Sequence, residues 1–364
     1  MHLSAVLLTG KPLSSPMLSA PPAGESAYQP HATTSASMAC MELFGQSVLQ
    51  RTIVSLQKTG VCAISVIAPS GCVNFPATKN VGITIAEQPA DRWCAVGRAL
   101  EKHAQLGIDT ALIAELGPYV ELDIPGALKF HRTKGQSITL LHDNRGPLSH
   151  WIVDIARLTS GPDSALPFDE DAAVNSPAPY RVEGYVNRLS GPRDFRRLVV
   201  DAFLGHCAIT PRGREIKPGV WIDEGARLHK TARLVAPAYV GCDTQVQSAA
   251  VITRFSNLER NCNIGEGSLV ANASILPHTI IGRGLDVSAA IVDGSEFIQL
   301  DRNITLRIQD RNLISNAAPR KLHMPTYLPE YEDSDHHTPD LELEYSQYLS
   351  RAAGRLLEVF KGEV

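Results

Sequence analysis

The chain has 364 residues, of which 44% are hydrophobic and 20% charged, and its formal net charge is −4. This length and composition predict about two domains with enough apolar residues to form real cores. The weakly acidic charge offers no electrostatic surface for nucleic acid, and no apolar run approaches the ~20 residues that span a bilayer. We therefore expect neither a nucleic acid nor a membrane as a partner.

The first eight residues lack the basic residues that open a signal peptide, and they fit a buried strand better. The seven cysteines form no CxxC pair and have no histidine at metal-ligand spacing. Cysteines of this kind are typical of reduced thiols in a cytosolic protein. The sequence thus predicts a cytoplasmic protein without a metal site.

Apolar strands and amphipathic helices alternate along the first third of the chain. Strands are expected at residues 4–8, 63–68 and 110–115, and helices at residues 46–58 and 92–106. This order predicts an α/β fold in which helices cover a parallel sheet.

Residues 12–40 separate the first strand from the first helix and are rich in Pro, Ser, Ala and Thr. A long connection after a strand of a parallel sheet lies at the carboxyl edge, where ligands usually bind. The same composition also suits a disordered insertion.

Aliphatic residues recur at every sixth position from residue 222 onward, and the residue two positions earlier is small in almost every case. A period of six fits neither an amphipathic helix nor an alternating strand. It predicts the hexapeptide repeats of a parallel β-helix, with roughly five coils over residues 217–309. The first nine repeat positions are Ile222, Leu228, Leu234, Val240, Val246, Ile252, Leu258, Ile264 and Val270.

The phase of six is expected to hold at Leu276 and then to slip by one residue. It should resume through Ile281, Val287, Val292, Ile298 and Ile304. A β-sandwich is the alternative, but its turns should recur irregularly, about every 8 to 12 residues. The hexapeptide pattern resembles the left-handed β-helix of acyltransferases and of sugar nucleotidyltransferases, and the fold alone does not choose between them.

Three further segments resemble the sugar nucleotidyltransferases, a family that includes mannose-1-phosphate guanylyltransferases. Residues 42–61 resemble the family's first helix, residues 123–135 resemble the helix after its metal site, and residues 184–195 resemble the segment around its second metal ligand. The resemblance implies a Rossmann-like nucleotidyltransferase domain at residues 1–212 and a left-handed β-helix at 213–316. Residues 317–364 would form an acidic linker and an amphipathic helix.

The family's Gly-rich phosphate loop is not matched. It corresponds here to Thr9-Gly10-Lys11, and no other Lys or Arg occurs in the first fifty residues. The family's sugar-phosphate lysine also has no counterpart after Asp154. Because phosphoryl transfer depends on positioning and charge neutralisation, these losses predict a degenerate active site.

The two magnesium-binding aspartates of the family correspond here to Pro118 and Arg188. Proline cannot bind a cation, whereas an arginine at the second position could hold a phosphate. If this correspondence is shifted by a few residues, Asn187, Asp123 or Asp194 would be the unrecognised ligands.

The resemblance and its departures together predict a catalytically silent relative of nucleotide-sugar and polysaccharide metabolism, either regulatory or binding a nucleotide or nucleotide sugar, without a cofactor. No catalytic residue is assigned. Base and sugar specificity cannot be predicted from these segments. The candidate nucleotide- and sugar-binding residues are Thr9, Gly10, Lys11, Glu87, Gly97, Gly184 and Arg188.

Two enzymatic alternatives stay open. An active pyrophosphorylase would convert a nucleoside triphosphate and a sugar 1-phosphate to a nucleotide sugar, and it would need Mg²⁺. A hexapeptide acyltransferase would use a histidine between coils as general base, for which His229 and His278 are the candidates. Both histidines are better explained as solvent-facing turn residues.

The tail is expected to end in an amphipathic helix at residues 339–360, which has apolar residues along one face. Such a helix either packs on the β-helix or docks on a second subunit. We therefore expect a homo-oligomer or a hetero-partner that binds through the β-helix or the C-terminal helix.

Overall fold

The computed structural model describes residues 3–9, 40–68, 80–86, 89–159 and 178–317. All of them belong to one compact unit, Met1–Pro319. The boundary expected at residue 212 stays a prediction, and the helix expected at residues 339–360 lies outside the described residues.

A seven-stranded sheet forms the first part of the chain, and its strand order is β10-β8-β9-β6-β1-β4-β5. Strand β1 pairs in parallel with β4 and β6, β4 with β5, and β10 with β8, which confirms the predicted parallel sheet. The strands are β1 (Leu3–Thr9), β4 (Ala63–Ala68), β5 (Val81–Ile85), β6 (Thr110–Leu116), β8 (Ile138–Asp143), β9 (Gly146–Asp154) and β10 (Tyr180–Arg181).

Strand β9 departs from the parallel pattern because it pairs antiparallel with both β6 and β8. A turn of two residues joins β8 to β9, and Gly146 after it has φ +124°. This backbone region is accessible to glycine and strained for other residues. Since β9 is antiparallel to both neighbours, β8 runs in the same direction as β6 and β1.

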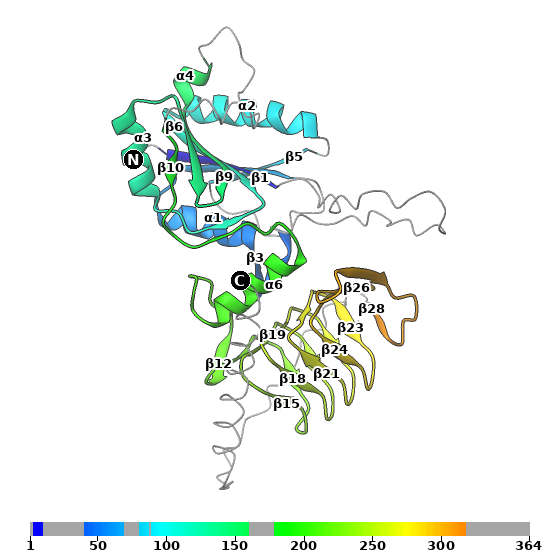
Figure 1. The fold of residues 1–364 in the computed structure, drawn as a ribbon. Helices are drawn as coiled ribbons and strands as arrows, with labels where there is room; N and C mark the ends of the chain where they lie inside the picture. The colour runs from blue at the N-terminus through cyan, green and yellow to red at the C-terminus, as the bar shows by residue number, and fades with distance from the viewer. Residues whose placement is uncertain (1–2, 10–39, 69–79, 87–88, 160–177, 318–364) are drawn as a thin grey trace, which may run out of the picture. The chain divides into compact units, whose positions relative to one another are not determined.

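Helices cover both faces of the sheet, with α1 and α2 on opposite sides (Figure 1). Alternate residues of β1 face opposite ways: Leu7 packs in the apolar cluster of α1, α3 and α6, and Leu8 packs in that of α2. The helices are α1 (Val48–Lys58), α2 (Pro89–Gln105), α3 (Ile124–Lys134), α4 (Ile155–Thr159) and α6 (Pro192–Phe203). Among the described residues, no helix combines the length and the apolar character that crossing a membrane requires.

Local signals explain where the helices begin. Ser47 and Gln50 form a capping box at the start of α1, and the Asp123 side chain accepts the Gly126 N–H at the start of α3. Helix α6 begins with Pro192, whose fixed φ suits the first helical position. Helix α1 begins two residues after the start of the helix predicted at residues 46–58.

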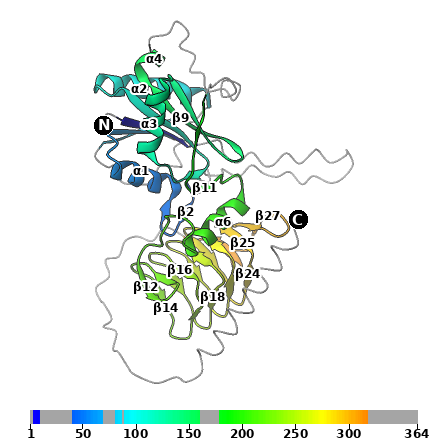
Figure 2. The same cartoon turned by 60° about the vertical axis from the view of Figure 1, so that its left-hand side comes forward.

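Short strands of residues 214–316, here called the coil region, stack as successive layers (Figure 2). Val220 pairs with Ala238, and Ala238 pairs with Ser256, so each strand meets the strand that follows 18 residues later. Two further parallel sheets repeat this spacing. The three sheets contain β13 (Val220–Ile222), β16 (Ala238–Val240), β19 (Ser256–Leu258), β22 (Ser274–Ile275) and β25 (Ala290–Asp293); β14 (Arg227–Leu228), β17 (Gln245–Val246), β20 (Asn263–Ile264) and β23 (Thr279–Ile281); and β15 (Arg233–Leu234), β18 (Val251–Thr253), β21 (Leu269–Ala271) and β24 (Asp286–Ser288).

The residues at every sixth position from Val240 to Val270 are all buried in the apolar core of the coil region. The one-residue change in the phase of the repeat comes earlier than predicted. Asn257 pairs with Ser274 at a distance of 17 residues, so the inward position falls to Ile275. Leu276 instead packs in the cluster of α1 and α6.

The last two expected repeat positions are wrong. Ile298 and Ile304 belong to β26 (Glu296–Gln299) and β27 (Ile304–Arg307), which pair antiparallel as a hairpin after β25. The side chain of Ile304 is exposed. A regular spacing of aliphatic residues does not distinguish a further coil from such a hairpin, because both place alternate residues on one face.

Candidate functional site

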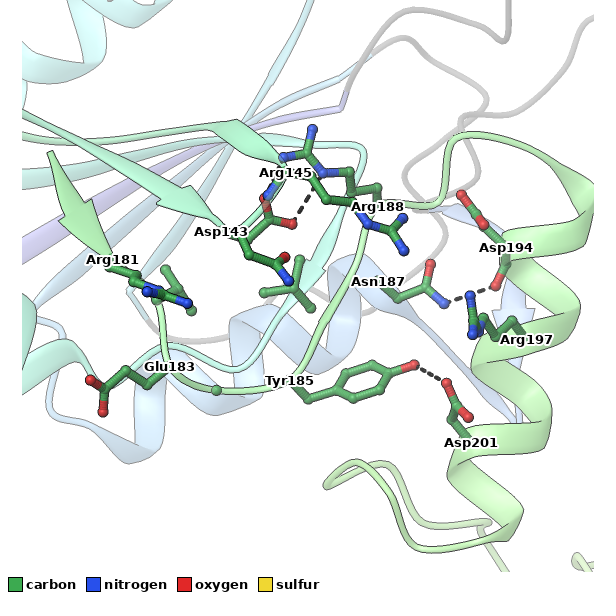
Figure 3. A pocket seen from close by; sticks show the side chains of 14 residues that line it. Asp143, Arg145, Arg181, Glu183, Tyr185, Asn187, Arg188, Asp194, Arg197 and Asp201 are labelled. Carbon is green, nitrogen blue, oxygen red and sulfur yellow. Dashed lines mark hydrogen bonds and ion pairs between the residues drawn. The ribbon is translucent and has the colours of Figure 1, made fainter. Parts of the chain in front are cut away.

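A pocket of about 590 Å³ opens at the carboxyl edge of the sheet (Figure 3). Asp143 ends β8 and Arg181 ends β10, and both strands run in the direction of β1 and β6. In open parallel sheets, ligands usually bind at this edge. The charged lining residues are Asp143, Arg145, Arg181, Glu183, Arg188, Asp194, Arg197 and Asp201.

Arg188 forms a two-pronged ion pair with Asp143. Its Nε lies 3.1 Å from Oδ2 and its Nη2 lies 2.5 Å from Oδ1, and Nη2 also donates to the Gly146 carbonyl at 2.9 Å. The Arg188 guanidinium, helped by the backbone N–H of Arg145, holds the pKa of Asp143 below its usual value. The charge of Arg188 is therefore already balanced inside the protein.

The loop that carries Arg188 is fixed by hydrogen bonds of Asn187, which ends β11 (Val186–Asn187). The Asn187 amide accepts the Leu189 N–H and donates to the Asp194 carbonyl, both at 2.9 Å. Leu189 itself has a positive φ of 47°. This bend turns the chain from β11 into α6.

Helix α6 supplies one wall of the pocket through Asp194, Arg197 and Asp201, which point to the same side (Figure 3). Asp194 accepts the Ser190 N–H at 2.9 Å. Asp201 accepts the Tyr185 hydroxyl at 2.6 Å. Burial, together with this hydrogen bond, raises the pKa of Tyr185, so its hydroxyl stays a neutral donor.

Three further arginines line the pocket, and their guanidinium groups have no partner among the described residues. Within the described part of the chain, the side chains of Arg145, Arg181 and Arg197 make no hydrogen bond and no ion pair. They come from three elements: the β8–β9 turn, β10 and α6. Guanidinium groups bind phosphate oxygens through paired N–H donors, so arginines from three elements around one pocket suit an anion that carries phosphate.

Two of the predicted site residues line this pocket, namely Gly184 and Arg188. Gly184 lies so close to the Glu121 carbonyl oxygen that a Cβ would overlap with it. Thr9 is buried at the end of β1, and its carbonyl accepts Arg92 Nη1 at 3.1 Å. Gly97 lies inside α2 and is not part of the lining, and Gly10, Lys11 and Glu87 lie outside the described residues.

The residues considered as metal ligands do not all meet at one place. Asn187 and Asp194 both line the pocket, but the Asn187 amide donates to the Asp194 carbonyl and Asp194 accepts the Ser190 N–H. Asp123 caps α3, and Pro118 lies between β6 and β7. Among the described residues, no group of three or more His, Cys, Asp or Glu side chains is placed to hold a metal ion.

The two histidines considered for acyl transfer have different surroundings. His229 is exposed, and its Nδ1 lies 2.8 Å from the Thr231 hydroxyl. His278 is half-buried rather than solvent-facing, and its Nε2 lies 3.2 Å from Arg260 Nη1. Burial and the neighbouring Arg260 lower the pKa of His278.

Sequence reasoning missed Arg145, Arg181 and Arg197 because they lie on separate elements. The one available signal is the density of arginine between residues 181 and 197, where five occur. That density does not show which side chains share a face. In the structure, Arg197 faces the pocket whereas its neighbour Arg196 points into the coil region.

No protein-family model matches this sequence, and no curated protein matches it. The geometry of the pocket is therefore the main guide to function.

Proposed function

We propose that the chain is a catalytically silent relative of the sugar nucleotidyltransferases that binds a nucleoside diphosphate sugar. In this proposal the seven-stranded sheet is a Rossmann-like nucleotidyltransferase domain, and the coil region is a left-handed β-helix. The observation that carries the proposal is the pocket at the carboxyl edge with the three unpaired guanidinium groups of Arg145, Arg181 and Arg197.

A diphosphate bridge fits these groups by charge and by shape. It carries two negative charges, and guanidinium groups bind phosphate oxygens through paired N–H donors. The pocket volume of about 590 Å³ falls within the ~300–1,000 Å³ that is typical of small-molecule sites.

The remaining polar groups suit sugar hydroxyls. Glu183 makes no hydrogen bond or ion pair with the described residues, and Asp194 accepts the Ser190 N–H through Oδ2, which leaves its other oxygen as an acceptor. Carboxylates accept hydrogen bonds from hydroxyl groups. A ligand with a diphosphate at one end and hydroxyls at the other would use both kinds of group.

Pro118 and Arg188 support binding without turnover. They stand where the resemblance implies carboxylates for magnesium, and Arg188 forms an ion pair with Asp143 instead. A guanidinium that is already paired with a carboxylate does not bind a cation. It cannot provide the open coordination positions that a catalytic metal offers.

Isothermal titration with GDP-mannose and UDP-glucose, each with and without Mg²⁺, tests the proposal. We expect binding that is independent of Mg²⁺ and that weakens about tenfold in Arg181→Ala, since a charge-assisted contact is lost. Arg233→Ala removes an exposed arginine of β15 and is the matched control. Binding of a nucleoside triphosphate only with Mg²⁺ would favour an active pyrophosphorylase, and no binding of either sugar nucleotide would refute the proposal.

A further inference from the structure

Helix α6 has a second function besides lining the pocket. Arg197 faces the pocket, whereas Arg193 and Arg196 extend into the coil region. Both Nε and Nη2 of Arg193 donate to the Leu300 carbonyl. Because a helix is stiff, the place where Arg196 is held determines where Arg197 lies.

Arg196 is buried among neutral acceptors. Its guanidinium donates to Asn257 Oδ1 at 3.2 Å, to Ser274 Oγ at 3.0 Å, to the Phe255 carbonyl at 2.9 Å and to Asn272 Oδ1 at 3.0 Å. Desolvation lowers its pKa to about 9, so it keeps its charge at neutral pH.

The side-chain amide of Asn257 lies between Arg196 and Glu259, the carboxylate that balances the charge of Arg196. Asn257 accepts from Arg196 through Oδ1 and donates through Nδ2 to Glu259 Oε1 at 2.7 Å. Glu259 also accepts the backbone N–H groups of Phe44 at 2.9 Å and Gly45 at 2.8 Å. These two residues connect β2 (Glu42–Leu43) to β3 (Gln46–Ser47), immediately before α1.

We propose that Asn257 is a positioning residue for the pocket: its buried amide joins Arg196 to Glu259 and so fixes helix α6 with Arg197 directed at the ligand. This inference rests on the proposed function, because its readout is ligand affinity. Asn257 is buried and is not one of the residues that line the pocket, so it acts through the helix. The coil region thereby sets the affinity of a site that it does not line.

A double-mutant cycle tests the proposal, with GDP-mannose and UDP-glucose as the probes in isothermal titration. Asn257→Ala is expected to weaken binding about tenfold when Arg197 is present and less than about twofold in the Arg197→Ala background. Arg145 lies on the β8–β9 turn and not on α6, so the tenfold effect should persist in Arg145→Ala. A purely structural role would give the same loss in all three backgrounds.

Ser274→Ala is the milder variant in case Asn257→Ala does not fold. It removes one acceptor of Arg196 and leaves Asn257 in place. We expect a loss of about threefold that likewise disappears in Arg197→Ala. Equal losses in every background, or no loss, would overturn the positioning role while the proposed function stands. No binding by the unmodified protein would overturn both.

Discussion

Arg188 shows how a single side chain can change the chemistry of a site. It is only partly exposed, and its guanidinium is paired with Asp143, whose side chain is 10% exposed. The Asp143 carboxylate neutralises the positive charge of Arg188, so a phosphate would meet no net positive charge at this position. Arg145, Arg181 and Arg197 carry no such partner among the described residues, so the free positive charge of the pocket lies with them.

Replacing each partner of this ion pair should change affinity in opposite directions. Asp143→Asn removes a negative charge beside the anion site, and we expect a nucleoside diphosphate sugar to bind roughly three- to tenfold more tightly. Arg188→Ala leaves the Asp143 carboxylate unpaired and should weaken binding by a similar factor. Titration at low and moderate salt measures both effects, and a loss in both variants would show that the pair acts only by holding the loop.

At the scale of elements, close backbone packing shapes the pocket as much as charge does. The chain at Gly184 passes directly over the Glu121 carbonyl that follows β7 (Tyr119–Val120), and the Glu121 N–H donates to the Tyr185 carbonyl at 2.9 Å. No Cβ fits between these two backbones. The lining from residue 181 to residue 188 therefore keeps its place only with a glycine at position 184.

Two glycine substitutions should have opposite effects on stability. Gly184→Ala forces the two backbones apart, and we expect it to lower the free energy of unfolding by about 1–3 kcal/mol and to weaken ligand binding. Gly97→Ala lies inside α2 where a Cβ meets nothing within 4 Å, and it should stabilise the protein by about 0.5–1 kcal/mol. Urea unfolding of both variants, with titration of the ligand, checks this. Unchanged binding in Gly184→Ala would show that the contact is not needed by the site.

For the whole molecule, the most consequential buried charge is that of Glu259. Burial raises its pKa to about 7 from an ordinary value near 4.5, although it accepts three hydrogen bonds. Arg51 of α1 and, through Asn257, Arg196 of α6 are the nearby positive charges. Keeping Glu259 ionised at neutral pH therefore costs folding free energy.

The sign of the resulting pH dependence follows from linkage. A carboxyl whose pKa is higher in the folded state binds more protons when folded, so its contribution to stability is full below about pH 4.5 and is lost as the pH rises to about 7. Relative to Glu259→Gln, the unmodified protein should lose about 3 kcal/mol of unfolding free energy between pH 5 and pH 8. Urea unfolding at both pH values measures the difference, and the exposed Glu266→Gln serves as the control. Parallel pH profiles for the unmodified protein and Glu259→Gln would contradict the role of this group.

Elements whose signals are local could be predicted from the amino-acid sequence alone. Apolar periodicity predicted α1 and α2, short apolar runs predicted the strands β1, β4 and β6, and the spacing of six identified the inward residues from Val240 to Val270. The predicted change in repeat phase came too late, because Ile275 and Leu276 are both buried and aliphatic and either could point inward. The pairing of Asn257 with Ser274 shows that Ile275 is the inward residue.

Which polar groups meet depends on how the whole chain packs. Arg145, Arg181 and Arg197 share a pocket because the β8–β9 turn, the end of β10 and one side of α6 border it, and strand order across a sheet is not encoded in local spacing. Glu259 reaches Phe44 and Gly45 across more than two hundred residues. Burial makes such contacts energetically decisive, but it depends on the packing of the whole chain, so no local pattern in the sequence could have predicted them.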